Sequence, residues 1–254
     1  MITDAATEEQ IDEKASPTTP TAPSTATDPK AFERFIARLK EEAYRNLDAS
    51  EHKVDLQGWM HTSLEPRIRE ILNLAEGGPI RMLEVGSWKG LSSSILGKLA
   101  RDRNDGSSVL CIDTWLGAPE FWTWGIDDPN RGTSLQCKNG YPSVFYTFTR
   151  NMKALRLENQ VIPFPISSDQ GFEVLRHYNA CFDLIYVDAA HEENAVLRDI
   201  ENAWSVLAPG GILFGDDYSS FWPGVVAAVN RFVSAHGLKG INEEVIWYIP
   251  KPAV

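Results

Sequence analysis

Short apolar runs alternate with stretches of helical periodicity over most of the chain. Six runs have the length and residue content of buried strands: Ile80–Val85, Val109–Asp113, Val161–Pro165, Phe182–Asp188, Gly211–Gly215 and Val245–Ile249. Four amphipathic stretches predict helices: Leu91–Arg101, Phe172–His177, Glu193–Leu207 and Val225–His236. This alternation predicts an α/β fold with a mostly parallel sheet and helices on both faces. In such sheets ligands bind outside the carboxyl ends of the strands.

The chain before the first predicted strand has two parts. Residues 1–28 consist mainly of Ala, Thr, Ser, Pro and acidic residues and contain no aromatic side chain. Such a segment cannot bury enough apolar surface to fold, so we expect a disordered tail. Apolar residues then recur at helical spacing over Phe32–Ala43 and Ser63–Ala75. We therefore expect a tail (1–28), an N-terminal helical cap (29–78) and one domain (79–254).

Composition narrows the classes of partner. The chain has 24 Lys+Arg against 35 Asp+Glu, a net charge of −11. This balance excludes a typical nucleic-acid or anionic-membrane binder, because such proteins cluster basic residues. Three scattered cysteines do not form a disulfide framework or a zinc motif. The first residues do not resemble a secretory signal and no stretch has the length of a membrane span, so we expect a cytoplasmic protein.

Two motifs at strand ends point to a nucleoside ligand. The first predicted strand ends in Glu84 and continues into a turn with Gly86 and Gly90. Glycines there permit a tight turn and a close approach of the backbone to a ligand. The spacing is G-x-x-x-G, which also fits an ordinary turn and differs from the dinucleotide pattern G-x-G-x-x-G. The second strand ends in Asp113, where an acid can accept hydrogen bonds from ribose hydroxyls or can simply stabilise a turn.

Acidic residues and a histidine follow the fourth and fifth predicted strands. The fourth ends in Asp188 and is followed by His191, and the fifth ends in Asp216-Asp217-Tyr218. Clustered carboxylates repel one another unless a cationic partner compensates them. A divalent metal, a sulfonium ion or a proton shared with a substrate would each do so.

These motifs together resemble a known family. The segments EVGSWKG, CIDTW, FDLIYVDAAH and PGGILFGDDY are similar to the class I S-adenosylmethionine-dependent methyltransferases, in particular the small-molecule O-methyltransferases of the macrolide-sugar and catechol type. The resemblance covers residues 80–249 and implies a Rossmann-like seven-stranded sheet with a reversed final hairpin. Ala189-Ala190 departs from the glycine-containing turn that is usual in this branch.

The resemblance implies roles for individual residues. It places S-adenosylmethionine against Glu84, Gly86, Ser87, Gly90, Asp113, Trp115, Ser167, Ser168 and Asp188. Within this set Asp113 holds the ribose, Trp115 flanks the adenine, and the two serines lie at the adenine edge. In metal-dependent relatives the equivalents of Asp188, Asp216 and Asp217 bind Mg²⁺, so we expect magnesium as a second cofactor. The predicted catalytic set is Asp188, His191 and Asp217. In this set His191 or one of the acids is the general base. The alternative for His191 is a structural role at the start of a helix.

A long connection is the candidate acceptor site. Residues 116–150 are rich in aromatic side chains, which suit flat acceptors or sugar rings, or which hold the insertion down. We expect some of Trp122, Trp124 and Trp222 to line the acceptor site. The leading interpretation is O-methylation of a small-molecule hydroxyl, with homo-oligomer formation left open. The alternatives are a nucleotide-dependent oxidoreductase and a non-catalytic methyltransferase-like binding protein.

Overall fold

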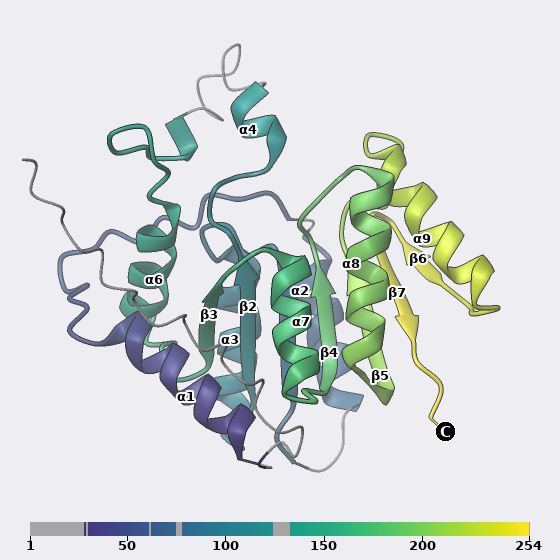
Figure 1. The fold of residues 1–254 in the computed structure, drawn as a ribbon, viewed down its shortest axis with the longest axis horizontal. Coiled ribbons are helices and arrows are strands. Elements are labelled where there is room, and N and C mark those ends of the chain that lie inside the picture. The colour runs from purple at the N-terminus through teal and green to yellow at the C-terminus, as the bar shows by residue number, and fades with distance from the viewer. Residues whose placement is uncertain (1–27, 29, 61, 75–77, 124–132, 254) are drawn as a thin grey trace, which may run out of the picture.

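Seven strands form one sheet in the order β3-β2-β1-β4-β5-β7-β6 (Figure 1). The structure is a computed structural model that describes residues 28, 30–60, 62–74, 78–123 and 133–253, so residues 1–27 of the predicted tail and Trp124 lie outside the described residues. The strands are β1 (Arg81–Val85), β2 (Ser108–Asp113), β3 (Val161–Pro165), β4 (Phe182–Val187), β5 (Leu207–Gly215), β6 (Ile241–Glu243) and β7 (Ile246–Pro250). The first five pair in parallel, and β7 runs antiparallel to β5 and β6. The mostly parallel sheet and the reversed final hairpin are thus confirmed.

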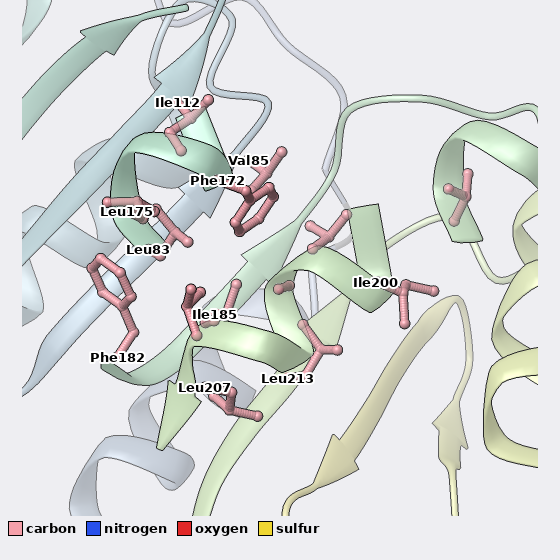
Figure 2. Close-up of a cluster of buried hydrophobic side chains, with 14 of the residues drawn as sticks. Leu83, Val85, Ile112, Phe172, Leu175, Phe182, Ile185, Ile200, Leu207 and Leu213 are labelled. Atoms are coloured by element: carbon pink, nitrogen blue, oxygen red, sulfur yellow. The ribbon is translucent and has the colours of Figure 1, made fainter. Parts of the chain in front are cut away.

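Helices cover both faces of this sheet, as predicted. They are α1 (Ala31–Tyr44), α2 (Leu64–Leu74), α3 (Leu91–Arg103), α4 (Pro119–Thr123), α6 (Val144–Ala154), α7 (Ser168–His177), α8 (Glu193–Val206) and α9 (Pro223–Ala235). Apolar residues of α1, α7, α8 and α9 pack on one face, and those of α2, α3 and α6 pack on the other. The rule that strand side chains alternate between faces explains this division. Leu83 and Val85 of β1 belong to the first core (Figure 2), and Met82 belongs to the second.

The insertion between β2 and β3 differs from the sequence-based expectation. We expected a long connection over residues 116–150, and the described part of this stretch contains helix α4 and most of helix α6. Val144, Phe148 and Met152 lie on the buried side of α6. Their i, i+4 spacing is the helical signal in a segment whose aromatic content suggested a binding loop.

The N-terminal helices are part of the two cores. Phe35 of α1 packs edge-on against Phe164 of β3, with ring centroids 5.2 Å apart. The Tyr44 hydroxyl donates a 3.0 Å hydrogen bond to the Val161 carbonyl of the same strand. Helix α1 therefore shields β3, which is an edge strand of the sheet. The predicted division at residues 28 and 78 stays a prediction, although α1 is integrated with the domain. No helix within the described ranges is long and apolar enough to cross a membrane.

The order of the strands positions the site. Strands β1 and β4 are neighbours, and the chain leaves β1 in one direction along the sheet and β4 in the other. A crevice forms outside the carboxyl ends of two such strands, because their connections run to opposite faces. The loops that follow β1, β2, β4 and β5 therefore meet at one edge of the sheet.

Candidate active site

A cleft of about 580 Å³ opens at the carboxyl ends of these strands. Residues of the loops after β1, β2, β3, β4 and β5 line it, together with α4 and the chain segment before α2. Among the predicted site residues, Gly86, Ser87, Asp113, Ser167, Ser168, Asp188, His191 and Asp217 line the cleft. Glu84, Gly90, Trp115 and Asp216 are not among its lining residues.

The turn after β1 depends on its first glycine. Gly86 has a φ of +88°, and a Cβ atom there would lie 2.0 Å from the carbonyl oxygen of Asp188. Both the backbone conformation and the contact with the end of β4 therefore exclude a side chain. Gly90 begins α3 with a φ of +91°. Gly86 thus brings the turn against the end of β4, and Gly90 brings the start of α3 against Phe148 and Met152 of α6.

The side chain of Glu84 holds this turn from the interior of the protein. Its side chain is fully buried and accepts hydrogen bonds from the hydroxyls of Ser87 and Ser93. Burial raises the pKa of the Glu84 carboxyl, and the serine hydroxyls oppose that shift. Its Oε1 atom is buried and has no hydrogen-bond partner in the described part of the chain. Glu84 therefore fixes the turn from within the core, and the prediction of direct cofactor contact is not met in this conformation.

Asp113 organises the backbone at the centre of the cleft. Its carboxylate accepts hydrogen bonds from the amides of Ser87 (2.8 Å), Trp88 (2.8 Å) and Trp115 (2.7 Å). Burial raises the pKa of Asp113, and these amide hydrogen bonds oppose the shift. Two of the three bonds go to Oδ2 and one to Oδ1. A carboxylate offers about four acceptor positions, so Asp113, which lines the cleft, can accept a further hydrogen bond.

Trp115 does not flank the cleft, which corrects the prediction that it contacts the adenine. Its side chain is only 1% exposed and packs against Phe145 and Phe148 of α6. The indole Nε1 donates a 2.7 Å hydrogen bond to the carbonyl of Trp88. The aromatic residue that does line the cleft here is Trp88, whose ring packs against Phe121 at 4.3 Å. Trp115 therefore belongs to the core that supports this wall.

The serines after β3 lie at the cleft, as predicted. The Ser167 side chain caps α7 by accepting a hydrogen bond from the Gln170 amide, and both Ser167 and Ser168 line the cleft. A buried acid of α8, Asp199, lies beside them and hydrogen-bonds with Ser168. Burial raises the pKa of Asp199 to about 6, and the Ser168 hydrogen bond opposes this shift. This end of the cleft therefore presents hydroxyls and one carboxyl.

His191 lies between two carboxylates at the other end. Its Nδ1 is 2.6 Å from Oε1 of Glu120, and its Nε2 is 3.1 Å from Oδ2 of Asp217. Its ring stacks on Trp222, with centroids 3.6 Å apart. Burial lowers the pKa of His191, but the hydrogen bonds with Asp217 and Glu120 outweigh it, so the net shift is upward. An imidazolium at this position is therefore stabilised from both sides.

Asp188 lines the cleft near His191. Removal from water raises its pKa well above the usual value, and the negative charges of Asp217 and Asp216 add to the shift. The hydroxyl of Tyr186 donates a 3.0 Å hydrogen bond to Oδ2 of Asp188 and opposes it. Three like charges, with His191 as a nearby partner, make this end of the cleft attractive to a cation.

The predicted magnesium triad does not assemble. Asp216 is buried, and its Oδ1 accepts a hydrogen bond from the Asp217 amide. Among the residues that the structure describes, no group of three or more His, Cys, Asp or Glu side chains has the arrangement of a metal site. Asp216 is buried just after β5, whereas Asp217, with a φ of +66°, lines the cleft. The expectation of Asp188, Asp216 and Asp217 as metal ligands therefore stays a prediction.

Sequence reasoning missed several cleft residues. Glu120 lies within the inserted segment with no motif around it, and Asp199 lies in the middle of α8. Trp59 and Met60 precede α2 and reach the cleft from the N-terminal region. Of the predicted tryptophans, Trp222 lines the cleft, whereas Trp122 is 49% exposed and does not. A pattern of apolar spacing carries no signal for such contacts, because tertiary packing creates them.

Comparisons with known proteins agree with this geometry. Structures with the same fold include an O-methyltransferase from Bacillus cereus in complex with SAH, with 12% identity, 87% of this chain and 97% of that chain covered, and a TM-score of 0.54. The O-methyltransferase NovP has 17% identity and a TM-score of 0.54, and the match covers 89% of this chain and 100% of NovP. The calicheamicin methyltransferase CalS11 has 15% identity and a TM-score of 0.53, and the match covers 92% of this chain and 99% of CalS11.

A sequence family adds to this likeness of fold. A search of curated proteins finds no match to the chain. A family model described as a methyltransferase domain matches residues 83–218, which include the turn after β1 and every predicted catalytic residue. Because this match spans more than half of the sequence, the protein belongs to the family of methyltransferase domains.

Proposed function

We propose that the protein transfers a methyl group from S-adenosylmethionine to a hydroxyl of a small, uncharged ring compound. One observation carries the proposal: a single cleft joins a nucleoside-sized polar end, with Asp113 and Ser167, to an acidic end that contains His191 and Asp188. Two solved structures with this fold are named O-methyltransferases, which supports the same reaction.

The residues present fit the methyl donor. The free acceptor position on Asp113 suits a ribose hydroxyl, and Ser167, Ser168 and Asp199 offer hydrogen-bond partners for the adenine edge. The negative potential of Asp188 and Asp217 suits the sulfonium end of the donor. When bound, the donor supplies an activated methyl, whose bond to sulfur breaks as the bond to the acceptor oxygen forms.

The chain itself removes the acceptor proton and aligns the reactants. A hydroxyl is a poor nucleophile at neutral pH, so its proton must leave to a base. In the proposal Nε2 of His191 takes that proton, and the resulting imidazolium is stabilised by Glu120 and Asp217. The same two hydrogen bonds raise the pKa of His191, which favours the imidazolium that forms when it takes the proton. Alignment within a closed cleft contributes about 7–11 kcal/mol in favourable cases.

Magnesium does not enter this proposal. The donor set for a divalent ion does not converge in the described chain, because the Asp216 side chain is buried outside the cleft. The proposal assigns the base function to His191.

The cleft wall indicates an uncharged acceptor with a flat ring. Trp88 packs on Phe121, which also approaches Trp59 at 5.7 Å, and Trp222 continues the aromatic surface on the far side of His191. Arg198 is the one Lys or Arg among the lining residues, against five acids. An aromatic wall with this charge favours neutral rings and disfavours phosphorylated acceptors.

Donor binding tests the first half of the proposal. We expect calorimetric titration to show binding of S-adenosylhomocysteine, with equal affinity in the presence and absence of magnesium. Asp113→Ala should weaken it about tenfold or more, because a charge-assisted hydrogen bond and the support of the turn are both lost. Trp122→Phe, which alters an exposed ring outside the cleft, is the matched control. Binding of NADH in place of S-adenosylhomocysteine by the folded protein would favour the oxidoreductase.

Methyl transfer from a labelled donor to a panel of neutral hydroxylated rings tests the second half. His191→Ala should lower kcat by about 10²–10⁴-fold and leave the affinity for S-adenosylhomocysteine unchanged. His236→Ala is the control, since this histidine hydrogen-bonds the backbone of α9 far from the cleft. Equal loss of donor binding and turnover in His191→Ala would remove the histidine from the role of base.

A further inference from the structure

Tyr186 has a hydroxyl group that packing alone does not require. The residue lies in β4, is fully buried, and packs its ring on Phe214 of β5 with the ring centroids 4.9 Å apart. A phenylalanine would fill the same space without a buried polar group. Because burying a hydroxyl costs free energy that a hydrogen bond must offset, the partner of this hydroxyl indicates its role.

The hydrogen-bond partner of the Tyr186 hydroxyl among the described residues is Oδ2 of Asp188, at 3.0 Å. Strand β1 fixes the backbone of both residues, since Tyr186 pairs with Glu84 and the Asp188 amide donates a 2.8 Å hydrogen bond to the Val85 carbonyl. Burial raises the pKa of the Tyr186 phenol well above its usual range, and the charges of Asp188, Asp216 and Glu84 add to the shift. The phenol therefore keeps its proton and remains a hydrogen-bond donor.

This contact places the two carboxylate oxygens of Asp188 in different surroundings. Oδ2 is held by the buried Tyr186, whereas Oδ1 has no hydrogen-bond partner among the described residues and is not one of the oxygens enclosed there without a partner. Because Asp188 lines the cleft, Oδ1 is the oxygen that remains accessible from it. A carboxylate whose orientation is fixed in advance acts on a charge in the cleft without reorganising first.

We propose that Tyr186 is a positioning residue for methyl transfer: its hydroxyl holds Oδ2 of Asp188 toward the interior, so that Oδ1 faces the sulfonium of S-adenosylmethionine. This inference rests on the proposed function and deepens it. S-adenosylmethionine and S-adenosylhomocysteine share every group except the methyl and the positive charge. A fixed Oδ1 therefore favours the first ligand through its charge, whereas the shape of the cleft acts on both alike.

Tyr186→Phe tests this role without any acceptor. Calorimetric titration at low salt gives the ratio of the affinity for S-adenosylmethionine to that for S-adenosylhomocysteine. One hydrogen bond corresponds to about a fivefold change, so this ratio should fall about fivefold, through weaker binding of S-adenosylmethionine. Tyr44→Phe is the matched control, because Tyr44 is also buried and donates a 3.0 Å hydrogen bond, to Val161 outside the cleft lining. It should keep the wild-type ratio.

A double-mutant cycle identifies the acid through which Tyr186 acts. The amide of Asp188→Asn carries no charge, so the ratio is already reduced in that variant and Tyr186→Phe should lower it no further. Equal effects of Tyr186→Phe with and without the Asp188 carboxylate would overturn the positioning role.

A second measurement keeps the hydroxyl in place. With 3-fluorotyrosine replacing Tyr186, we expect the ¹⁹F signal to differ between the two ligand complexes, because the sulfonium attracts the carboxylate that accepts from the phenol. The same replacement at Tyr44 should give one signal in both complexes. Identical signals from the probe in place of Tyr186 overturn the inference, even where Tyr186→Phe fails to fold.

The outcomes separate the two proposals. A folded Tyr186→Phe variant that keeps the wild-type ratio, or that loses both affinities equally, overturns the inference, while binding of S-adenosylhomocysteine by the wild type leaves the proposed function standing. Failure of the wild type to bind S-adenosylhomocysteine overturns both.

Discussion

Trp88 adopts a backbone conformation that a bulky residue rarely takes, with a φ of +47°. Two contacts hold it there: its amide donates to Asp113, and its carbonyl accepts from the indole of Trp115. Strained residues of this kind persist where their surroundings fix them, often at ligand sites. The positions of Asp113 and Trp115 thus have a structural purpose in shaping the cleft wall, beside any contact that Asp113 makes with a ligand.

Asp199 makes stability depend on pH. Its pKa rises from 3.8 to about 6 in the folded protein, so the folded state binds the proton more tightly than the unfolded chain. The stabilisation from this group is therefore complete below the unfolded pKa and is lost as the pH rises through about 6. The shift corresponds to about 3 kcal/mol at most.

Asp199→Asn removes this dependence. We expect the variant to gain up to about 3 kcal/mol of unfolding free energy relative to the wild type between pH 4 and pH 8, because the amide carries no charge at either pH. Urea denaturation at several pH values measures the difference, in which the other titrating groups cancel. Asp102→Asn, at an exposed surface acid, should show no such change. A constant difference across this range would show that Asp199 titrates normally.

At the scale of elements, the turn between β1 and α3 is fixed by contact with β4. Gly86→Ala would place a Cβ 2.0 Å from the carbonyl oxygen of Asp188. Gly140 has a similar φ of +83°, but a Cβ there would meet nothing within 4 Å, so it isolates the backbone cost.

We expect Gly140→Ala to destabilise the protein by about 1–2 kcal/mol, which is the cost of the left-handed conformation alone. Gly86→Ala should cost more than Gly140→Ala and should also weaken binding of S-adenosylhomocysteine, because the turn must move away from β4. Denaturation and calorimetry measure the two effects. Equal stability of the two variants, with normal ligand binding in both, would mean that the turn tolerates displacement.

Helix α1 offers a test of how the N-terminal region belongs to the domain. Phe35 contacts Phe164 of β3 and stacks on Tyr178 at 5.0 Å. Phe35→Ala should lower the free energy of unfolding by about 2–3 kcal/mol, somewhat less than for a fully buried phenylalanine. Arg38→Ala on the exposed side of α1, whose side chain pairs with Glu42, should change it by less than about 0.5 kcal/mol. An unaffected unfolding transition in Phe35→Ala would mean that α1 docks independently of the domain fold.

Over the whole molecule, the periodic pattern of the sequence predicted the strands and helices, but it did not predict which distant side chains meet in the cleft. The strands β1 to β5 follow from apolar runs, and β3 matches its predicted bounds because it is bounded by turns on both sides. Cleft residues at strand ends, such as Asp113 and Asp188, were predictable because topology fixes where parallel strands end. Glu120 was not, since only the folding of the insertion brings it 2.6 Å from His191. The burial of Trp115 and Asp216 was not predictable for the same reason. Each belongs to a motif with cleft residues, but tertiary packing places its side chain in the interior.

The charge of the whole molecule makes a last prediction about the donor. S-adenosylmethionine and S-adenosylhomocysteine differ by one methyl group and one positive charge, and this protein carries a net charge of −11 with five acids around its cleft. The cationic donor should therefore gain from an attraction that salt screens, whereas the uncharged sulfur of the product gains nothing. We expect the ratio of the affinity for S-adenosylmethionine to that for S-adenosylhomocysteine to fall about two- to fivefold between low and physiological salt. Calorimetry measures both affinities. Asp188→Asn should reduce this ratio at low salt, because Asp188 lines the end of the cleft where the sulfonium is proposed to lie. Identical salt dependence for the two ligands would place the sulfonium away from these acids, and His191 would then have to take its proton without a neighbouring methyl donor.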